Sequence, residues 1–387
     1  MSHDKYAHCR FGYPARHRRK VPFSPDIRVP DGFLARMTEI TDLDHELDRF
    51  ILSESNYREL VAQAIASNVH QSVRLEGNPL SAQVVRKLTR DSLRAGATRS
   101  PKAMPTPHHQ EILNHVFVWQ NPGPLATAWA PATIGSVHGF LFEQGEVVDK
   151  PGEFRGGTNE PSEVLTDQGQ VIFITAPSGV VEEELASLCV WLGRTGAALF
   201  PVVAAAVFFH ELESIHPFWD GNGRTGRTLF HTYLQLNGLR NAHLCMIEQE
   251  LAGSDPELYY RILGWTDSSG SYTELIDYFV DGVLAAYRKA HRRLAKLDLL
   301  STSLDETAKR ILVRAKREKD WFSVRQASSW VSKRSDQTIR RNLNSLVKAG
   351  ALHTRGKTVA KRYRFAAPFS IPRPGGPPGD QGRTTRR

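Results

Sequence analysis

The sequence predicts a mainly α-helical protein with one small β-hairpin and a separate, basic C-terminal part made of three helices and a β-ribbon. Apolar residues recur at helical spacing through much of the first 300 residues, for example over residues 57–72. Within that region the segment 171–175, Val-Ile-Phe-Ile-Thr, has the composition of a strand. Near residue 300 the composition shifts from mixed to basic. A chain of 387 residues is long for a single core, so we expect more than one domain.

Composition narrows the classes of protein to which the chain can belong. Its hydrophobic content of 40% and charged content of 24% are ordinary for a globular protein. The sequence has no apolar run near the ~18 residues that span a bilayer. The polar, basic N-terminus lacks the apolar stretch of a secretory signal, so we expect a cytoplasmic protein without a membrane partner. Cys9, Cys189 and Cys245 form no C-x-x-C pair, which argues against a disulfide framework and a zinc site.

We divide the chain into five parts. Residues 1–30 carry many prolines and charges and are expected to form a flexible basic arm. Residues 31–105 are a helical region, 106–298 a helical core, 299–367 the basic domain, and 368–387 a disordered tail rich in Pro, Gly and Arg. In the core we expect a hairpin with a long loop between residues 152 and 177, and helices over 107–119, 131–143, 181–200, 202–215, 229–236, 257–264 and 272–297.

The candidate chemistry is concentrated in residues 216–227, His-Pro-Phe-Trp-Asp-Gly-Asn-Gly-Arg-Thr-Gly-Arg, which join two predicted helices. The turn Gly221-Asn222-Gly223 lets backbone N–H groups converge, and the helix that follows adds the positive end of its dipole. Such a turn is a nest for phosphate oxygens. Arg224 and Arg227 lie three residues apart, share a helix face and suit phosphate recognition.

Two further residues of this segment supply reactive groups. His216 can accept a proton from an incoming hydroxyl at neutral pH. Asp220 is a hard oxygen ligand, which beside a polyphosphate suits Mg²⁺. Base, metal ligand, anion nest and paired arginines are what phosphoryl-type transfer requires. A zinc protease is disfavoured, because His210 and His216 are six residues apart, whereas the zinc ligands of H-E-x-x-H lie four apart on one helix face.

At these residues the chain resembles the Fic family, whose pattern H-[PF]-F-x-[DE]-G-N-G-R-x-x-R is satisfied throughout residues 216–227. The resemblance implies the helical Fido fold and the transfer of AMP from ATP to a Ser, Thr or Tyr of a target protein or of the chain itself. It implies that His216 deprotonates the hydroxyl and that Asp220 holds Mg²⁺. The implied ATP-binding residues are Gly221, Asn222, Gly223, Arg224, Thr225, Gly226, Arg227 and Tyr260.

Two other segments resemble binding features of the family. The segment 152–155, Gly-Glu-Phe-Arg, resembles the start of the flap, a hairpin that binds the target by strand pairing, which implies flap roles for Phe154 and Arg155. Tyr259 and Tyr260 resemble the aromatic pair that closes over adenine, although core packing is the expected role for one of the two.

A third segment resembles the inhibitory motif of the family, [ST]-x-x-x-E-[GN]. Ser72 and Glu76 satisfy it within residues 72–77 and share a helix face. In the family this glutamate pairs with the second motif arginine, here Arg227, and blocks productive seating of the ATP γ-phosphate. Its position N-terminal to the core implies the self-inhibited class.

The basic composition of the C-terminal part of the chain indicates a nucleic-acid partner. Residues 301–387 hold 21 Lys and Arg against 6 Asp and Glu, a net of +15, so the first 300 residues sum to −6. Helices over 305–317 and 324–330, a third capped by Asp336 and ended by Gly350, and a ribbon over 352–365 resemble a winged helix. Its basic face suits DNA, and dimerisation or target docking is the alternative. The outward residues would be Gln337, Arg340, Arg341 and Asn344 on the third helix and Lys357, Lys361 and Arg362 in the wing.

The leading hypothesis is therefore a self-inhibited, Mg²⁺-dependent protein adenylyltransferase. Removal of AMP from a modified protein, with Glu76 aligning a water, and a nucleotide-sensing DNA-binding regulator remain as alternatives. Phosphate transfer is disfavoured, because family members that transfer phosphate replace the glycine at the position of Gly223 by a bulkier basic residue. The partners implied are a target protein with a hydroxyl side chain, with DNA and a homodimer left open.

Overall fold

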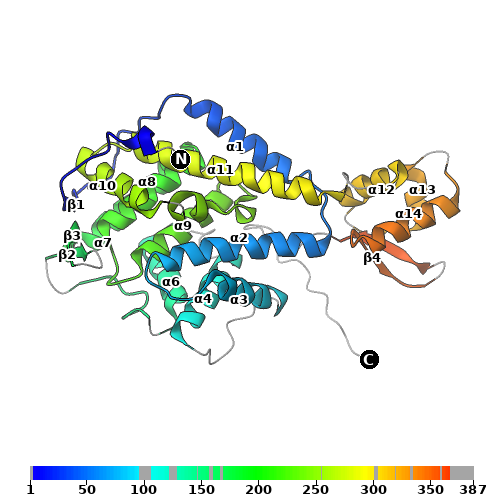
Figure 1. Cartoon of the computed structure of the whole chain (residues 1–387), viewed down its shortest axis with the longest axis horizontal. Coiled ribbons are helices and arrows are strands. Elements are labelled where there is room, and N and C mark those ends of the chain that lie inside the picture. The colour runs from blue at the N-terminus through cyan, green and yellow to red at the C-terminus, as the bar shows by residue number, and fades with distance from the viewer. Residues whose placement is uncertain are drawn as a thin grey trace. The chain divides into compact units, whose positions relative to one another are not determined.

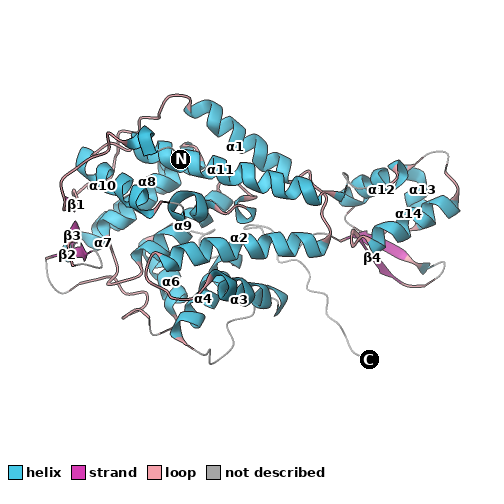
Figure 2. Cartoon of the chain, in the orientation of Figure 1, coloured by secondary structure: helices cyan, strands magenta, loops and turns pink. Residues whose placement is uncertain are grey.

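The computed structural model describes residues 3–95, 106–121, 129–145, 147–156, 160–165, 169–253, 255–299, 304–318, 320–331, 334–357 and 360–366. Most of these residues are helical, with a few short strands (Figure 2). They divide into two compact units, one formed by residues 3–44 and 63–287 and the other by 45–62 and 288–366. The predicted tail over 368–387 lies outside the described residues.

The first unit is helical, as the sequence predicts, and its helices appear in Figure 1. In the described parts of the chain, no helix is both long enough and apolar enough to cross a membrane. α1, α2 and α11 contribute residues to both units. The helices are α1 (Phe33–Leu47), α2 (Glu54–Arg74), α3 (Ala82–Ala95), α4 (Pro107–Gln120), α6 (Pro131–Phe142), α7 (Val181–Arg194), α8 (Pro201–Ile215), α9 (Asn222–Leu236), α10 (Pro256–Ser269) and α11 (Thr273–Leu297).

The central helix of this unit is α8, which is buried on nearly every side. It begins at Pro201, whose fixed φ and missing N–H suit the first helical position. An apolar run from Val202 to Phe209 then leaves no polar face, as is typical of a helix enclosed by others. α7 and α9 pack against it. α8 therefore gives a rigid support to the loop that follows it.

The predicted hairpin forms from β2 (Pro161–Leu165) and β3 (Val171–Pro177), which pair antiparallel with irregular register. A third strand, β1 (Ala15–Arg16), pairs in parallel with β3 and places Ala15 opposite Phe173. The sheet order is therefore β1-β3-β2. The sequence gives no sign of β1, because two residues are too few to show alternation.

Residues 3–30 are not the flexible arm that their composition predicts. Tyr6, Cys9, Ala15 and Phe23 are all buried in the first unit. Composition predicts disorder because charges and prolines leave little apolar surface to bury. Here the charged side chains are themselves accommodated, since the helical core holds buried carboxylates that need positive partners.

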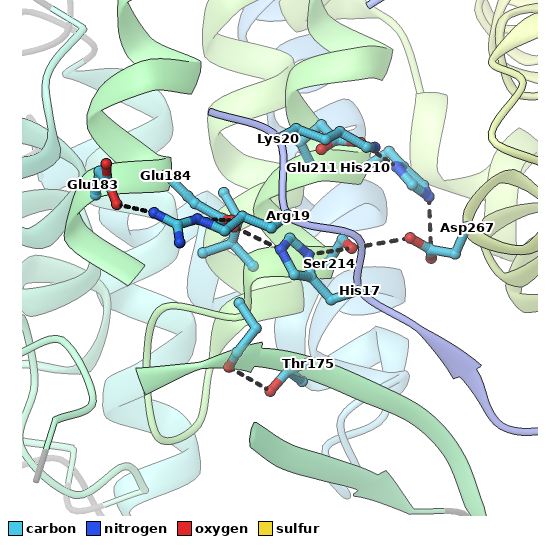
Figure 3. A network of polar contacts seen from close by, with 12 residues as sticks. His17, Arg19, Lys20, Thr175, Glu183, Glu184, His210, Glu211, Ser214 and Asp267 are labelled. Atoms are coloured by element: carbon cyan, nitrogen blue, oxygen red, sulfur yellow. Dashed lines mark hydrogen bonds and ion pairs between the residues drawn. The ribbon is translucent and has the colours of Figure 1, made fainter. Parts of the chain in front are cut away.

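His17, Arg19 and Lys20 of this segment lie close to α7 and α8 (Figure 3). His17 Nε2 is 2.6 Å from Glu184 Oε2, and Lys20 Nζ is 2.7 Å from Glu211 Oε1. Each of the two glutamates is only 2% exposed. Burial by itself would raise the pKa of Glu211, but His210 and Lys20 hold it at about 2. The segment is thus fixed by charge compensation, since an unpaired buried carboxylate is strongly unfavourable.

The second unit contains α12 (Glu306–Arg317), α13 (Val324–Trp330), α14 (Asp336–Lys348) and the antiparallel strands β4 (Leu352–Arg355) and β5 (Arg362–Phe365). The predicted cap of the third helix is wrong by one residue. Ser335 accepts a hydrogen bond from Thr338 N at 3.2 Å, and Asp336 is the first helical residue. The apolar faces meet in one core that includes Ile311, Leu312, Ile339, Leu343, Leu346 and Tyr363.

Replacing Lys20 by alanine tests whether charge compensation fixes the N-terminal segment. The change leaves Glu211 buried with Tyr272 and His210 as its remaining partners. We expect the free energy of unfolding to fall by about 1–3 kcal/mol in denaturant titrations. Arg28→Ala is the matched control, because its pair with Asp26 is largely exposed, and it should cost no more than about 0.5 kcal/mol. Equal losses for the two variants would contradict the assignment.

Candidate active site

The loop between α8 and α9 is shaped by two residues with left-handed backbone. His216 has φ 54° and ends α8, and its N–H donates to Leu212 O at 2.9 Å. Gly221 has φ 77° and precedes the first turn of α9. A positive φ is uncommon for a residue other than glycine, and such residues concentrate at functional sites. The left-handed backbone of His216 thus ends α8 and begins the loop.

The side chain of Asn222 stabilises the loop through hydrogen bonds to the backbone of Phe218. Its Oδ1 accepts from Phe218 N at 2.8 Å, and its Nδ2 donates to Phe218 O at 2.9 Å. The side chain is buried, and these bonds use its oxygen and one of its two N–H groups to fix the Phe218 backbone.

The protonation of His216 suits a general base. Its Nδ1 lies 3.3 Å from Glu213 O, and since a carbonyl oxygen only accepts, Nδ1 carries the proton. Nε2 then has the free lone pair. Burial lowers the pKa of His216 to about 4, so the ring is neutral at pH 7. A neutral imidazole with a free Nε2 is ready to accept a proton from a hydroxyl.

Arg224 is held on both sides by carboxylates. Its Nη1 lies 2.7 Å from Glu111 Oε1, and its Nη2 lies 2.8 Å from Asp220 Oδ1. The guanidinium also stacks 4.7 Å from the centre of the Phe142 ring. Arg224 and Glu111 are buried, whereas the Asp220 side chain is 52% exposed. Asp220 is thus the member of this group that solvent or a bound ion can reach.

Arg227 meets both residues of the predicted inhibitory motif. Its Nε donates to Ser72 Oγ at 2.9 Å, and its Nη2 donates to Glu76 Oε1 at 2.7 Å. The first turn of α9 has no side-chain cap, and a Cβ at Gly223 would collide with the Glu76 carboxylate. The glutamate therefore lies at the positive end of α9, which is where a helix binds anions.

His138 joins the motif loop to the flap, and the sequence did not predict it. The ring stacks on Phe218 at 3.8 Å between centres. Burial lowers its pKa to about 4, its Nδ1 accepts from Gly152 N at 2.8 Å, and its Nε2 donates to Asp220 O at 2.9 Å. The only sequence signal is a histidine inside the mostly apolar helix expected over 131–143.

Glu111 is a second residue that sequence reasoning missed. It is 1% exposed, and its two oxygens are used by Arg224 Nη1 and by Asn78 Nδ2 at 2.7 Å. No spacing rule links position 111 to position 224, so only the tertiary fold shows the pair. Glu111 fixes the direction of Arg224, and Asn78 in turn fixes Glu111.

The two predicted flap residues point into the protein. Arg155 is 3% exposed, and its guanidinium donates to the backbone oxygens of His216, Ile215 and Ala176. Its backbone N–H donates to Pro217 O at 2.8 Å. The Phe154 ring lies 5.3 Å from that of Phe218. These side chains fix the flap to the motif loop, and neither is exposed as a ligand for a target segment would be.

Of the remaining predicted site residues, some are packed inside the protein and one is exposed to solvent. Thr225 is fully buried. A Cβ at Gly226 would lie 2.7 Å from Glu213 Oε1 and 3.0 Å from the ring of Phe209, so Gly226 allows the close contact of α9 with α8. Tyr259 is 1% exposed, whereas Tyr260 is 40% exposed. Tyr260 lines a cavity of about 110 Å³ that also includes His216. Of the pair, Tyr260 is the one placed to meet a ligand.

Comparison with known proteins identifies the domain that carries this site. Residues 129–234, which contain α6, the flap, α8, the motif loop and most of α9, match the model of the Fic/DOC family. Residues 129–234 therefore form a Fic domain. A solved Fic family protein from Desulfovibrio desulfuricans G20 covers 89% of this chain and 98% of its own, with a TM-score of 0.56 and 22% sequence identity. That likeness shows a shared fold.

Two curated relatives resemble the Fic domain over shorter stretches. A probable protein adenylyltransferase of Aquifex aeolicus is 41% identical over 70 residues, which are 18% of this chain and 21% of that protein. Protein adenylyltransferase Fic of Aedes aegypti is 51% identical over 49 residues, which are 12% and 10% of the two chains. The match thus spans only a tenth to a fifth of the length of these curated relatives.

Glu213 gives a pH test of this part of the Fic domain. Burial raises the pKa of its carboxyl to about 8, and its Oε1 has no hydrogen-bond partner among the described residues. Below about pH 4.5 the carboxyl is protonated in both folded and unfolded chains. As pH rises toward 8, only the unfolded chain has released this proton, so the site lowers the stability of the fold.

We therefore expect Glu213→Gln, which is neutral at every pH, to gain stability relative to wild type as pH rises from 5 to 8. The gain should exceed about 1 kcal/mol at pH 8 and be measurable in chemical denaturation. Glu182→Gln is the control, since Glu182 is exposed on α7. A difference between wild type and Glu213→Gln that does not change with pH would contradict the assignment.

Proposed function

We propose that this chain is a protein adenylyltransferase that moves AMP from ATP to a Ser, Thr or Tyr hydroxyl, and that its resting form is held inactive by Glu76. The observation that carries the proposal is the carboxylate of Glu76 at the N-terminus of α9, bonded to Arg227. A helix terminus with two arginines attracts an anion. In the resting chain that anion is supplied by the protein itself.

The geometry supports nucleotide transfer in the following way. The acceptor hydroxyl gives its proton to His216 Nε2, and its oxygen attacks the α-phosphorus of ATP. The bond from that phosphorus to the bridging oxygen breaks, and pyrophosphate leaves. The neutral state of His216 at pH 7 makes it competent as the base without any prior proton loss.

The phosphates would be bound by α9 and its arginines. The uncapped N–H groups of the first turn point toward the loop, and Arg224 is already oriented by Glu111. Arg227 becomes available to the outer phosphates only when Glu76 releases it. The same terminus then binds either the carboxylate or the nucleotide, which is why occupancy by one excludes the other.

Asp220 fits the predicted magnesium ligand as a single exposed carboxylate. The described residues hold no cluster of three or more His, Cys, Asp or Glu that could bind a metal by themselves. Mg²⁺ retains several waters and commonly uses one or two carboxylates together with substrate phosphates. Bound there, it would neutralise phosphate charge during transfer. Arg224 would remain beside Asp220 through their existing contact.

Substitution of Glu76 tests the inhibition. Glu76→Gly removes a charge-assisted hydrogen bond worth about 1.5–3 kcal/mol, so transfer of radiolabelled AMP from ATP to protein should rise by about 10- to 100-fold. Glu76→Gln keeps an acceptor oxygen and loses the charge, so it should give an intermediate rate. Adding His216→Ala to Glu76→Gly should lower the rate by about 10²–10⁴. Equal labelling by wild type, Glu76→Gly and the double variant would refute the proposal.

A second function is favoured by the surface of the second unit. We propose that this unit is a winged helix that binds duplex DNA. α14 buries Ile339 and Leu343, whereas its Arg340 and Arg341 are exposed. Lys361 Nζ lies 3.3 Å from Asn344 Oδ1 and so connects the strand pair to this exposed face. Further exposed basic residues follow on the strand pair, namely Arg355, Lys357 and Arg364.

Replacing Arg340 by alanine tests this surface. If Arg340 contacts phosphate, the variant should bind all duplex sequences more weakly. The slope of log K against log salt concentration should become shallower by about 1. Arg310→Ala removes the same charge from an exposed position on α12 and should leave the slope unchanged. Failure of the wild type to bind duplex DNA even at low salt would remove the proposal.

A further inference from the structure

The cavity beside His216 is lined in part by the chain's own N-terminal segment. Phe11 and Tyr13 come from that segment, and Ile172 and Phe173 come from flap strand β3. The lining is mainly apolar, which suits an aromatic side chain. The cavity thus brings together the proposed base, the flap and a tyrosine of the same chain.

The N-terminal segment lies on the flap in the manner of a bound peptide. Immediately after Tyr13, β1 pairs with β3 and places Ala15 opposite Phe173. Addition of a strand to a sheet edge is a general mode of peptide recognition. Here the edge of β3 that β2 leaves open is already taken by the chain's own segment.

Two built-in contacts keep this segment in place. Phe11 packs so closely on α10 that a Cβ at Gly264 would collide with its ring. His17 and Lys20 neutralise the buried carboxylates of Glu184 and Glu211 (Figure 3). Departure of the segment would leave both carboxylates buried without these partners, so the bound arrangement is strongly favoured. Tyr13 is therefore a permanent part of the cavity wall.

Tyr13 differs from the other hydroxyls that line the cavity. Ser214 is buried and donates its proton to Asp267 Oδ1 at 2.9 Å. Tyr260 is carried by α10 and is the residue we assign to the nucleotide. Tyr13 is 53% exposed and lies on a segment between two anchors. A tethered hydroxyl has a far higher effective concentration than one on a separate protein.

We infer that Tyr13 is an acceptor of the chain's own transferase reaction, so that the N-terminal segment is a site of AMP modification. The inference rests on the proposed function. In this step Tyr13 Oη forms a bond to the α-phosphorus of ATP, the bond from that phosphorus to the leaving oxygen breaks, and pyrophosphate departs. The phenolic proton goes to His216 Nε2. The product is an O-adenylyl tyrosine beside the flap.

The test uses the full-length Glu76→Gly chain with ATP and Mg²⁺, followed by peptide mass spectrometry. We expect one AMP group on the peptide that contains Tyr13. In the same background, Tyr13→Phe should abolish that mark while keeping the ring. Tyr6→Phe is the matched control, because Tyr6 lies in the same segment but bonds Asp277 away from the cavity, and it should leave the mark on Tyr13 unchanged.

Two further measurements show whether Tyr13 is modified by its own chain or by another. Modification within one chain predicts a rate constant for labelling of Tyr13 that does not change over a tenfold range of protein concentration. A His216→Ala chain mixed with the active Glu76→Gly chain should gain no AMP on its Tyr13. A rate that rises with concentration, or labelling of the His216→Ala chain, would overturn the intramolecular assignment.

Failure of this inference can be told from failure of the proposed function. If the Glu76→Gly chain places AMP on other residues or on added proteins while the Tyr13 peptide stays unmodified, the acceptor assignment is wrong and the transferase stands. If that chain transfers AMP neither to itself nor to proteins of a cell extract, and His216→Ala is indistinguishable from it, both are refuted.

Discussion

The ion pair between Arg227 and Glu76 is the interaction on which our functional interpretation of this site depends. It places a carboxylate at the positive end of α9 and engages the arginine that we propose as a ligand of the outer phosphates. Under the proposed function, a nucleotide would have to displace this carboxylate to reach Arg227. The same charge balance that stabilises the fold also sets the resting state of the proposed enzyme.

Internal charge compensation recurs in the segment that lines the cavity shared with His216. Glu184 and Glu211 are buried on α7 and α8, and the N-terminal segment supplies their partners. This pairing brings Tyr13 to the cavity beside His216. Ion pairs thus fix the positions of both regions. In the proposed enzyme, one region would control access of the nucleotide and the other would form part of the acceptor side.

The sequence located the Fic domain because its pattern is local in the chain. Residues 216–227 need only a turn and one helical turn, and the family match over residues 129–234 contains them. The roles assigned to these residues stay predictions. The helices of the core followed from apolar periodicity. The prediction of a flexible arm was wrong for residues 3–30, because an argument from composition treats every charged side chain as exposed to solvent. In the fold, those charges meet carboxylates from helices more than 150 residues away.

By itself the sequence determined the helical class and the Fic motif, because both depend on short spacing in the chain. It also implied the pairing of Glu76 with Arg227, through a pattern shared with the family. Tertiary structure decided the partners of those residues. Glu111 orients Arg224, His138 joins the loop to the flap, and Arg155 fixes the flap instead of exposing its side chain. It also placed Tyr13 beside His216. These contacts join residues far apart in the chain, and neither periodicity nor composition carries information about which distant side chains a fold brings together.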